Sequence, residues 1–214
     1  MDMNLWKKDF MLIRKQFIVT TSVEFVLFLV MEIQFRGSIF SGLPLPALTG
    51  IFTYMLTGRV FERDEKNMGA CLMISAGYGR RQIIRNRFGF IAGISFSFWL
   101  ICSVIHFILN SFMFEKIIVS CSIAFFISSL FIGMAVPFLS KYSYIKAQNA
   151  MTAMFFLMII VFLFVGRYWD MLPQWLKGFI HMGPAGSVGV IGIGLVILGA
   201  GYVLSLMGYE LREF

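Results

Sequence analysis

Six long apolar stretches, separated by short polar or basic links, constrain this chain more than any other feature. About 20 mostly apolar residues cover the roughly 30 Å hydrocarbon core of a bilayer as one helix. Stretches of that kind lie near 17–35, 38–58, 89–109, 117–139, 148–166 and 187–208. The sequence therefore predicts an all-α integral membrane protein with six transmembrane helices.

The composition predicts one membrane domain over residues 1–214. Apolar residues make up 59% and charged residues 14% of the chain, whereas about a quarter of the residues of a soluble domain are charged. No long polar or low-complexity run divides the sequence. The first apolar stretch is followed by five more and has no small-residue cleavage site behind it, which predicts a retained span and not a cleaved signal peptide.

The distribution of positive charge predicts the orientation. If the N-terminus is cytoplasmic, the inner segments carry 14 Lys and Arg residues and the outer links carry 4. Basic loops tend to stay on the cytoplasmic side, so both ends are expected in the cytoplasm. The formal net charge of +7 then reflects topology and lipid headgroups, and we expect no nucleic acid partner.

The sequence lacks the motifs of common metal-binding, redox and nucleotide-binding sites. Cys71, Cys102 and Cys121 form no C-x-x-C pair, and His106 and His181 are too far apart for an H-E-x-x-H zinc site. No Gly-Lys dipeptide exists, so the phosphate-binding loop G-x-x-x-x-G-K-[ST] is absent. We therefore expect no metal site, no catalytic site and no nucleotide site in this chain.

Residues 4–17 predict an amphipathic helix in the plane of the membrane interface. An apolar stripe repeats at i, i+4, i+7 and i+11 and is flanked by basic residues, as in helices that lie among lipid headgroups. The stripe consists of Trp6, Phe10, Ile13 and Phe17. A simple basic anchor that obeys the positive-inside rule is the alternative.

The link 59–88 is too long and too ordered in pattern for a plain tether. An acidic cluster, Glu62, Asp64 and Glu65, favours a helix N-terminus, and Gly77 with Gly79 favours a helix end. A second helix is expected from Arg80 into the third span. The apolar face between these signals comprises Met68, Cys71, Leu72 and Ser75. We expect a short exposed cytoplasmic helix that docks on a partner, with a headgroup-bound basic loop as the alternative.

This pattern resembles the type-two permeases of ATP-binding-cassette exporters. The resemblance rests on the order of an aromatic residue, an acidic D-E-K cluster, a glycine, an apolar pair, a small-residue turn, an arginine and an isoleucine. In this chain these are Phe61, Asp64, Glu65, Lys66, Gly69, Leu72, Met73, Gly77, Arg80 and Ile84. The turn of residues 75–80 departs from the Leu-Pro-Val-Ser-Arg-like turn that many members have.

The resemblance implies a permease subunit that works as a homodimer or heterodimer with a separate ATPase, which binds the ATP and Mg²⁺. The coupling residues that it implies are Glu62, Asp64, Glu65, Met68, Leu72, Tyr78 and Arg80. It also implies export across a bacterial plasma membrane. Small members of the family include exporters of phenol-soluble modulins and other amphipathic peptides of Gram-positive bacteria, so amphipathic or hydrophobic cargo is expected.

Ionisable residues inside spans mark further candidates. Glu24 should face protein or water, either on the translocation path or paired with donors of a neighbouring span. For His106 we expect an interhelical hydrogen bond. The segment 167–186 is expected to be re-entrant in the resembling family, with plain interfacial packing of its aromatic residues as the alternative.

Small residues recur every seven positions in the last span and predict close helix packing, within one subunit or between two. The two stripes are Ser187, Gly194 and Gly201, and Ala185, Gly192 and Gly199.

Among rival functional classes, an intramembrane enzyme is supported only by an incomplete match to the motif G-x-S-x-G at 185–189. A secondary transporter would show paired broken helices, and a membrane immunity protein would not need the segment 59–88.

Overall fold

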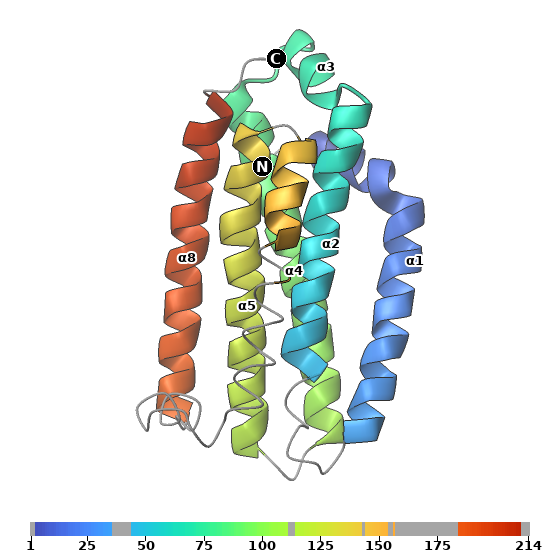
Figure 1. The fold of residues 1–214 in the computed structure, drawn as a ribbon, viewed down its shortest axis with the longest axis vertical. Helices are drawn as coiled ribbons and strands as arrows, with labels where there is room; N and C mark the ends of the chain where they lie inside the picture. Colours follow the sequence, from blue (N-terminus) through green and yellow to red (C-terminus); the bar gives the residue numbers. More distant parts are fainter. Residues whose placement is uncertain are drawn as a thin grey trace.

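The computed structural model describes residues 3–35, 44–110, 114–142, 144–153, 156 and 184–210, and the elements in these ranges are helices. Figure 1 shows the long helices side by side in one bundle, with the short helix α3 at one end. The bounds are Met3–Phe35 for α1, Pro44–Lys66 for α2, Gly69–Ser75 for α3, Arg80–Leu109 for α4, Phe114–Lys141 for α5 and Pro184–Glu210 for α8. A further helix covers 144–153.

Four helices in the described part of the chain are long and apolar enough to cross a membrane. They agree with the first, third, fourth and sixth predicted spans. Their apolar segments are Ile13–Gln34, Arg80–Leu109, Ile117–Lys141 and Gly186–Glu210. Most of the fifth predicted span, 148–166, and residues 167–183 of the predicted re-entrant segment lie outside the described residues. The six-span arrangement therefore stays a prediction.

Helix α2 contains residues 44–58 of the second predicted span, 38–58, and is more polar than the other four long helices. Its threonines lower its hydropathy, yet Thr49, Thr53 and Thr57 are buried. Each hydroxyl donates to the carbonyl four residues earlier, with oxygen–oxygen distances of 2.7–2.8 Å. Because these hydroxyls are satisfied within their own helix, α2 can lie among α1, α4 and α5 without unpaired polar groups.

The glycine stripe of the last span forms the contact between α8 and α5. Gly201 lies against the backbone of Gly133, and Gly194 lies against Phe125 and Ser129 of α5. The second stripe differs, because a Cβ atom on Gly192 or Gly199 would meet nothing within 4 Å. The first stripe therefore packs inside the subunit, as close approach between small residues predicts.

A buried polar cluster joins α1 and α4 at the end of the bundle opposite α3. Glu32 and His106 are 1% and 2% exposed, and Oε1 of Glu32 lies 2.7 Å from Nδ1 of His106. Asn110 donates from Nδ2 to Oε2 of Glu32 at 2.9 Å. The expected interhelical hydrogen bond of His106 is confirmed.

Replacing Glu32 by alanine is expected to lower the free energy of unfolding by about 1–3 kcal/mol, because His106 and Asn110 lose their buried acceptor. Denaturant titration of the purified protein in detergent measures the change. Gln34→Ala is the matched control, since Gln34 is exposed on the same turn of α1. Equal effects of the two substitutions would contradict a structural role for the cluster.

Candidate coupling site at the α3 end

Helix α3 projects beyond the bundle between α2 and α4 (Figure 1). Met68 precedes it with a left-handed backbone, φ 49°. Gly77 follows it with φ +88°, a conformation that glycine adopts without steric cost. The amide of Gly77 donates to the carbonyl of Ile74, and the amide of Tyr78 to that of Met73, both at 3.0 Å. These bonds end the helix and turn the chain into α4.

The predicted apolar face of α3 is exposed. Met68 is 71% and Leu72 64% exposed, and Cys71 and Ser75 are exposed beside them. Ala70 and Met73 are buried on the opposite face, against the bundle. The helix therefore packs on the bundle with one side and presents Leu72 outward, next to Met68, which precedes the helix. Neighbouring exposed apolar side chains can form a protein contact surface.

Asp64, at the end of α2, lies inside the protein and joins three helices. Its Oδ1 atom lies 2.8 Å from Nη2 of Arg87 on α4 and 3.2 Å from Nζ of Lys8 on α1. Asp64 is 5% and Arg87 2% exposed. Asp64 and Arg87 therefore form a buried ion pair. The ring of Phe61 lies 5.0 Å from the guanidinium carbon of Arg87.

Helix α3 contacts this ion cluster directly. Nζ of Lys8 lies 3.2 Å from the sulfur of Met73, and a Cβ atom on Gly69 would collide with the Asp64 carboxylate. The lack of a side chain at position 69 therefore leaves room for the Asp64 carboxylate beside the start of α3. These contacts connect α3 with Lys8 of α1 and Asp64 of α2.

Asp9 completes the cluster as a second acid. It is 5% exposed, and its carboxylate lies 3.7 Å from Nζ of Lys8. Burial raises the pKa of Asp9, while the charges of Arg87 and Lys8 lower it. Two acids thus balance two bases in the space between α1, α2 and α4.

The other predicted coupling residues make contacts within this chain. Glu62 is bound to Lys66 at 2.7 Å and to Arg59 at 3.5 Å, and the hydrogen bond from Lys66 lowers the pKa of Glu62. Oε2 of Glu65 accepts from the amide of Tyr144 at 2.6 Å, which joins α2 to the helix 144–153. These acids are therefore held by their neighbours at the rim of the α3 end.

Tyr78 is half-buried against the core. Arg80 is exposed and donates to the carbonyl of Glu210 in α8 at 3.1 Å, and the neighbouring Arg81 pairs with the Glu210 carboxylate. Of the predicted coupling residues, Met68, Leu72, Glu65 and Arg80 thus have exposed side chains, whereas Asp64 is internal.

The predicted interface stripe continues directly into the first span, since both belong to α1. Ile13 is 2% exposed, Phe10 is exposed, and Trp6 and Phe17 are half-buried. Trp6 packs edge-on against Phe90 of α4 at 5.8 Å between ring centroids, and Phe17 against Phe52 of α2 at 6.2 Å. Much of the stripe faces α2 and α4, because these helices offer apolar side chains to it.

Three members of the ion cluster, Lys8, Asp9 and Arg87, were not among the predicted site residues. From the sequence, Lys8 and Arg87 are simply two of the basic residues in the segments expected to be cytoplasmic. The available signal was that a continuous apolar run follows Arg87 directly, and a charge at the edge of a span needs a partner. The identity of that partner depends on how α1, α2 and α4 pack.

A family model described as "ABC-2 family transporter protein" matches residues 4–210. The match includes the ion cluster, α3 and the four apolar helices described above. No curated protein and no solved structure matches the chain.

Proposed function

Since the chain belongs to the ABC-2 family of transporter membrane proteins, whose permeases carry no nucleotide-binding domain and work with a separate ABC ATPase, we propose that α3 docks on that ATPase. The exposed pair Met68 and Leu72 is the observation that supports the proposal. An exposed apolar pair at a bundle end suits a groove on a partner, where apolar side chains act as anchors.

The ion cluster supplies a physical route from the docking surface to the spans. Asp64 and Arg87 connect α2 with α4, and Lys8 connects both α1 and α3 to Asp64. A displacement of α3 by the ATPase would change these contacts. We therefore propose that Asp64 acts as an internal link below the docking surface, while Met68 and Leu72 touch the partner.

The proposal places the α3 end in the cytoplasm of a bacterial cell, at the plasma membrane. The basic residues that gather in the N-terminal segment and in 59–88 support this orientation. The proposed activity is export of amphipathic or hydrophobic cargo, including peptides such as phenol-soluble modulins, by two permease copies or two homologous permeases.

Leu72→Glu is expected to weaken binding of the cognate ATPase at least roughly tenfold, since an apolar anchor of a docking surface contributes about 2 kcal/mol or more. The measurement is co-purification of the tagged permease with ABC ATPases encoded beside it, followed by titration of the complex. Phe114→Glu is the matched control, because Phe114 is also an exposed apolar residue but begins α5 at the opposite end of the bundle.

ATPase binding is compared only between permease variants whose melting temperature in detergent equals that of the unmodified permease. Loss of the ATPase from Leu72→Glu alone supports docking through α3. Undiminished binding by a folded Leu72→Glu variant would contradict it.

A further inference from the structure

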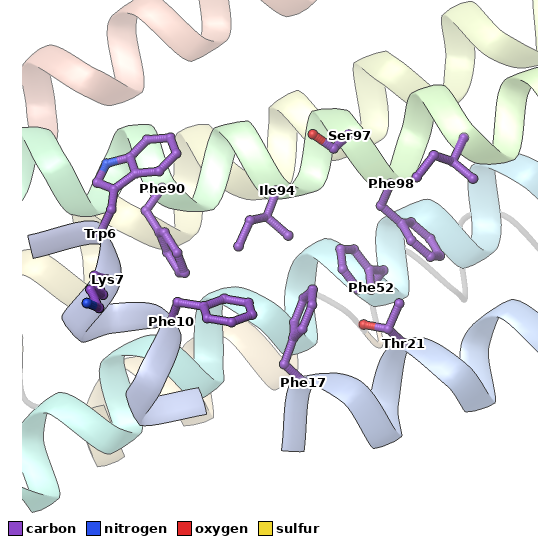
Figure 2. A pocket seen from close by; sticks show the side chains of 11 residues that line it. Trp6, Lys7, Phe10, Phe17, Thr21, Phe52, Phe90, Ile94, Ser97 and Phe98 are labelled. Atoms are coloured by element: carbon purple, nitrogen blue, oxygen red, sulfur yellow. The ribbon is translucent and has the colours of Figure 1, made fainter. Parts of the chain in front are cut away.

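An apolar groove of about 730 Å³ lies between the N-terminal half of α1 and the helices α2 and α4. This volume is in the range of binding sites for small organic molecules. Figure 2 shows aromatic rings gathered along the groove from all three helices. The phenylalanines among its lining residues are Phe10, Phe17, Phe52, Phe90 and Phe98.

The rings form a nearly continuous apolar surface. Phe52 stacks on Phe98 with 3.9 Å between ring centroids and 16° between planes. Phe17 meets Phe52 edge-on at 6.2 Å, and Phe10 meets Phe17 edge-on at 5.9 Å. Such a surface suits a hydrocarbon chain, because it provides apolar contact and few hydrogen-bonding groups.

The groove has about the length of one bilayer leaflet. On α4 it extends from Phe90 to Ile101, which is about 16 Å along a helix. One leaflet contributes about 15 Å to the hydrocarbon core of a bilayer. On α1 the groove begins at residues 6–10, which precede the apolar segment Ile13–Gln34. One end of the groove therefore lies at the level of the lipid headgroups, and the other end lies deep in the leaflet.

The headgroup end of the groove carries a positive charge. Among the described residues that line the groove, Lys7 alone is charged, and Figure 2 shows it at the end where Trp6 and Phe10 lie. Lys7 is exposed and forms no ion pair within the described part of the chain. The neighbouring Lys8 differs, because its ammonium group is held by Asp64. Lys7 is thus available to an anionic headgroup, which basic residues at a membrane surface attract.

The other charges nearby on α1 have the same sign at the surface. Within residues 3–18, the exposed charged side chains that the structure describes are Lys7, Arg14 and Lys15. The acid of this segment, Asp9, is buried in the ion cluster. The headgroup end is therefore complementary to an anion and repels a cation.

We propose that this groove binds an anionic phospholipid of the surrounding bilayer, with one acyl chain along the phenylalanines and the phosphate group at Lys7. A zwitterionic lipid matches the apolar part of the groove but has no net charge for its basic end. The bound lipid contacts α1, α2 and α4 together, the same three helices that the ion cluster joins. The site is separate from the α3 surface proposed to dock on the ATPase.

The test uses the full-length permease in nanodiscs of phosphatidylcholine, without any ATPase. The probe is phosphatidylglycerol with a photoreactive group at the end of one acyl chain, and phosphatidylcholine with the same chain is the counterpart without net charge. The phosphatidylglycerol label is expected on peptides that contain Thr21 or Ser97, which line the groove beyond its headgroup end. Its yield against the mole fraction of probe gives the affinity.

Lys7→Gln is expected to weaken binding of the phosphatidylglycerol probe about fivefold, the effect of one lysine at an anionic membrane surface. Labelling by the phosphatidylcholine probe should not change. Lys15→Gln is the matched control, because it removes the same charge from an exposed lysine of α1 that does not line the groove. Equal losses in the two variants would mean attraction to the protein surface only and would overturn the proposal.

Ser97→Phe provides a second variant that keeps Lys7. Ser97 lines the groove and is exposed, so a ring there fills the space and is expected to weaken labelling at Thr21. Leu100→Phe is its control, because Leu100 is exposed on α4 outside the groove. Equal labelling by the two probes, or labels outside the groove, would also overturn the proposal. Because no ATPase is present, these results are independent of the Leu72→Glu docking test.

Discussion

Arg87→Ala is expected to destabilise the permease by about 3–5 kcal/mol, the typical effect of removing one partner from a buried ion pair. The substitution leaves Asp64 and Asp9 buried without their main counter-charge, because Arg87 lies 2.8 Å from Asp64 and is 2% exposed. The packing of the guanidinium on Phe61 is lost as well. The measurement is the free energy of unfolding in detergent, with the yield of folded protein from membranes as a second readout.

Arg85→Ala is the control, since Arg85 precedes Arg87 by two residues on α4 and is exposed. It is expected to change the free energy of unfolding by less than about 0.5 kcal/mol. The double variant Asp64→Leu with Arg87→Met separates charge from packing, because apolar replacement of both partners of a buried pair can be neutral. A small loss in Arg87→Ala that equals the loss in Arg85→Ala would contradict the cluster described above.

The second large effect is expected at the contact between α5 and α8. A Cβ atom on Gly201 would collide with the backbone of Gly133, including its carbonyl oxygen at 2.6 Å. Backbone atoms cannot rotate away as a side chain can, so the two helices must separate. Gly201→Leu is therefore expected to cost about 3 kcal/mol or more, at or above the upper end of overpacking effects. Unfolding in detergent measures the change.

Gly199→Leu is a closely matched control, because it makes the same substitution two residues earlier on α8, where a Cβ atom meets nothing within 4 Å. In a single permease copy it is expected to leave stability nearly unchanged. Equal stability of the two leucine variants would contradict the close contact between Gly201 of α8 and Gly133 of α5.

Membrane character, helical class and the positions of several elements follow from the sequence alone. Apolar runs of span length predict helices wherever the backbone must satisfy its own hydrogen bonds in lipid. The runs at 17–35, 89–109, 117–139 and 187–208 are all helical in the structure. Glycine at position 77 correctly marks the end of α3, because its backbone there has a positive φ.

The sequence also predicts the exposed position of Leu72 on α3. The prediction that the acidic cluster of Glu62, Asp64 and Glu65 marks a helix N-terminus is wrong, because these acids lie at the C-terminal end of α2 and α3 begins at Gly69. The sequence does not predict the burial of Asp64, because it places Asp64 in one acidic cluster with Glu62 and Glu65. Three neighbouring acids look alike along the chain. They differ only in what α1 and α4 bring against each of them.

The local sequence pattern thus determined that the chain lies in a bilayer, where its long helices are and that α3 has an apolar face. These features depend on residues only a few positions apart. Tertiary packing alone decided which charges are paired. Asp64 is more than 20 residues away in sequence from both Lys8 and Arg87. In the structure, nitrogen atoms of these two bases lie within 3.2 Å of Oδ1 of Asp64. The same packing buries Glu24 without a hydrogen-bond partner in the described part of the chain. Electrostatic pairing depends on distance in space, and only the folded bundle sets that distance.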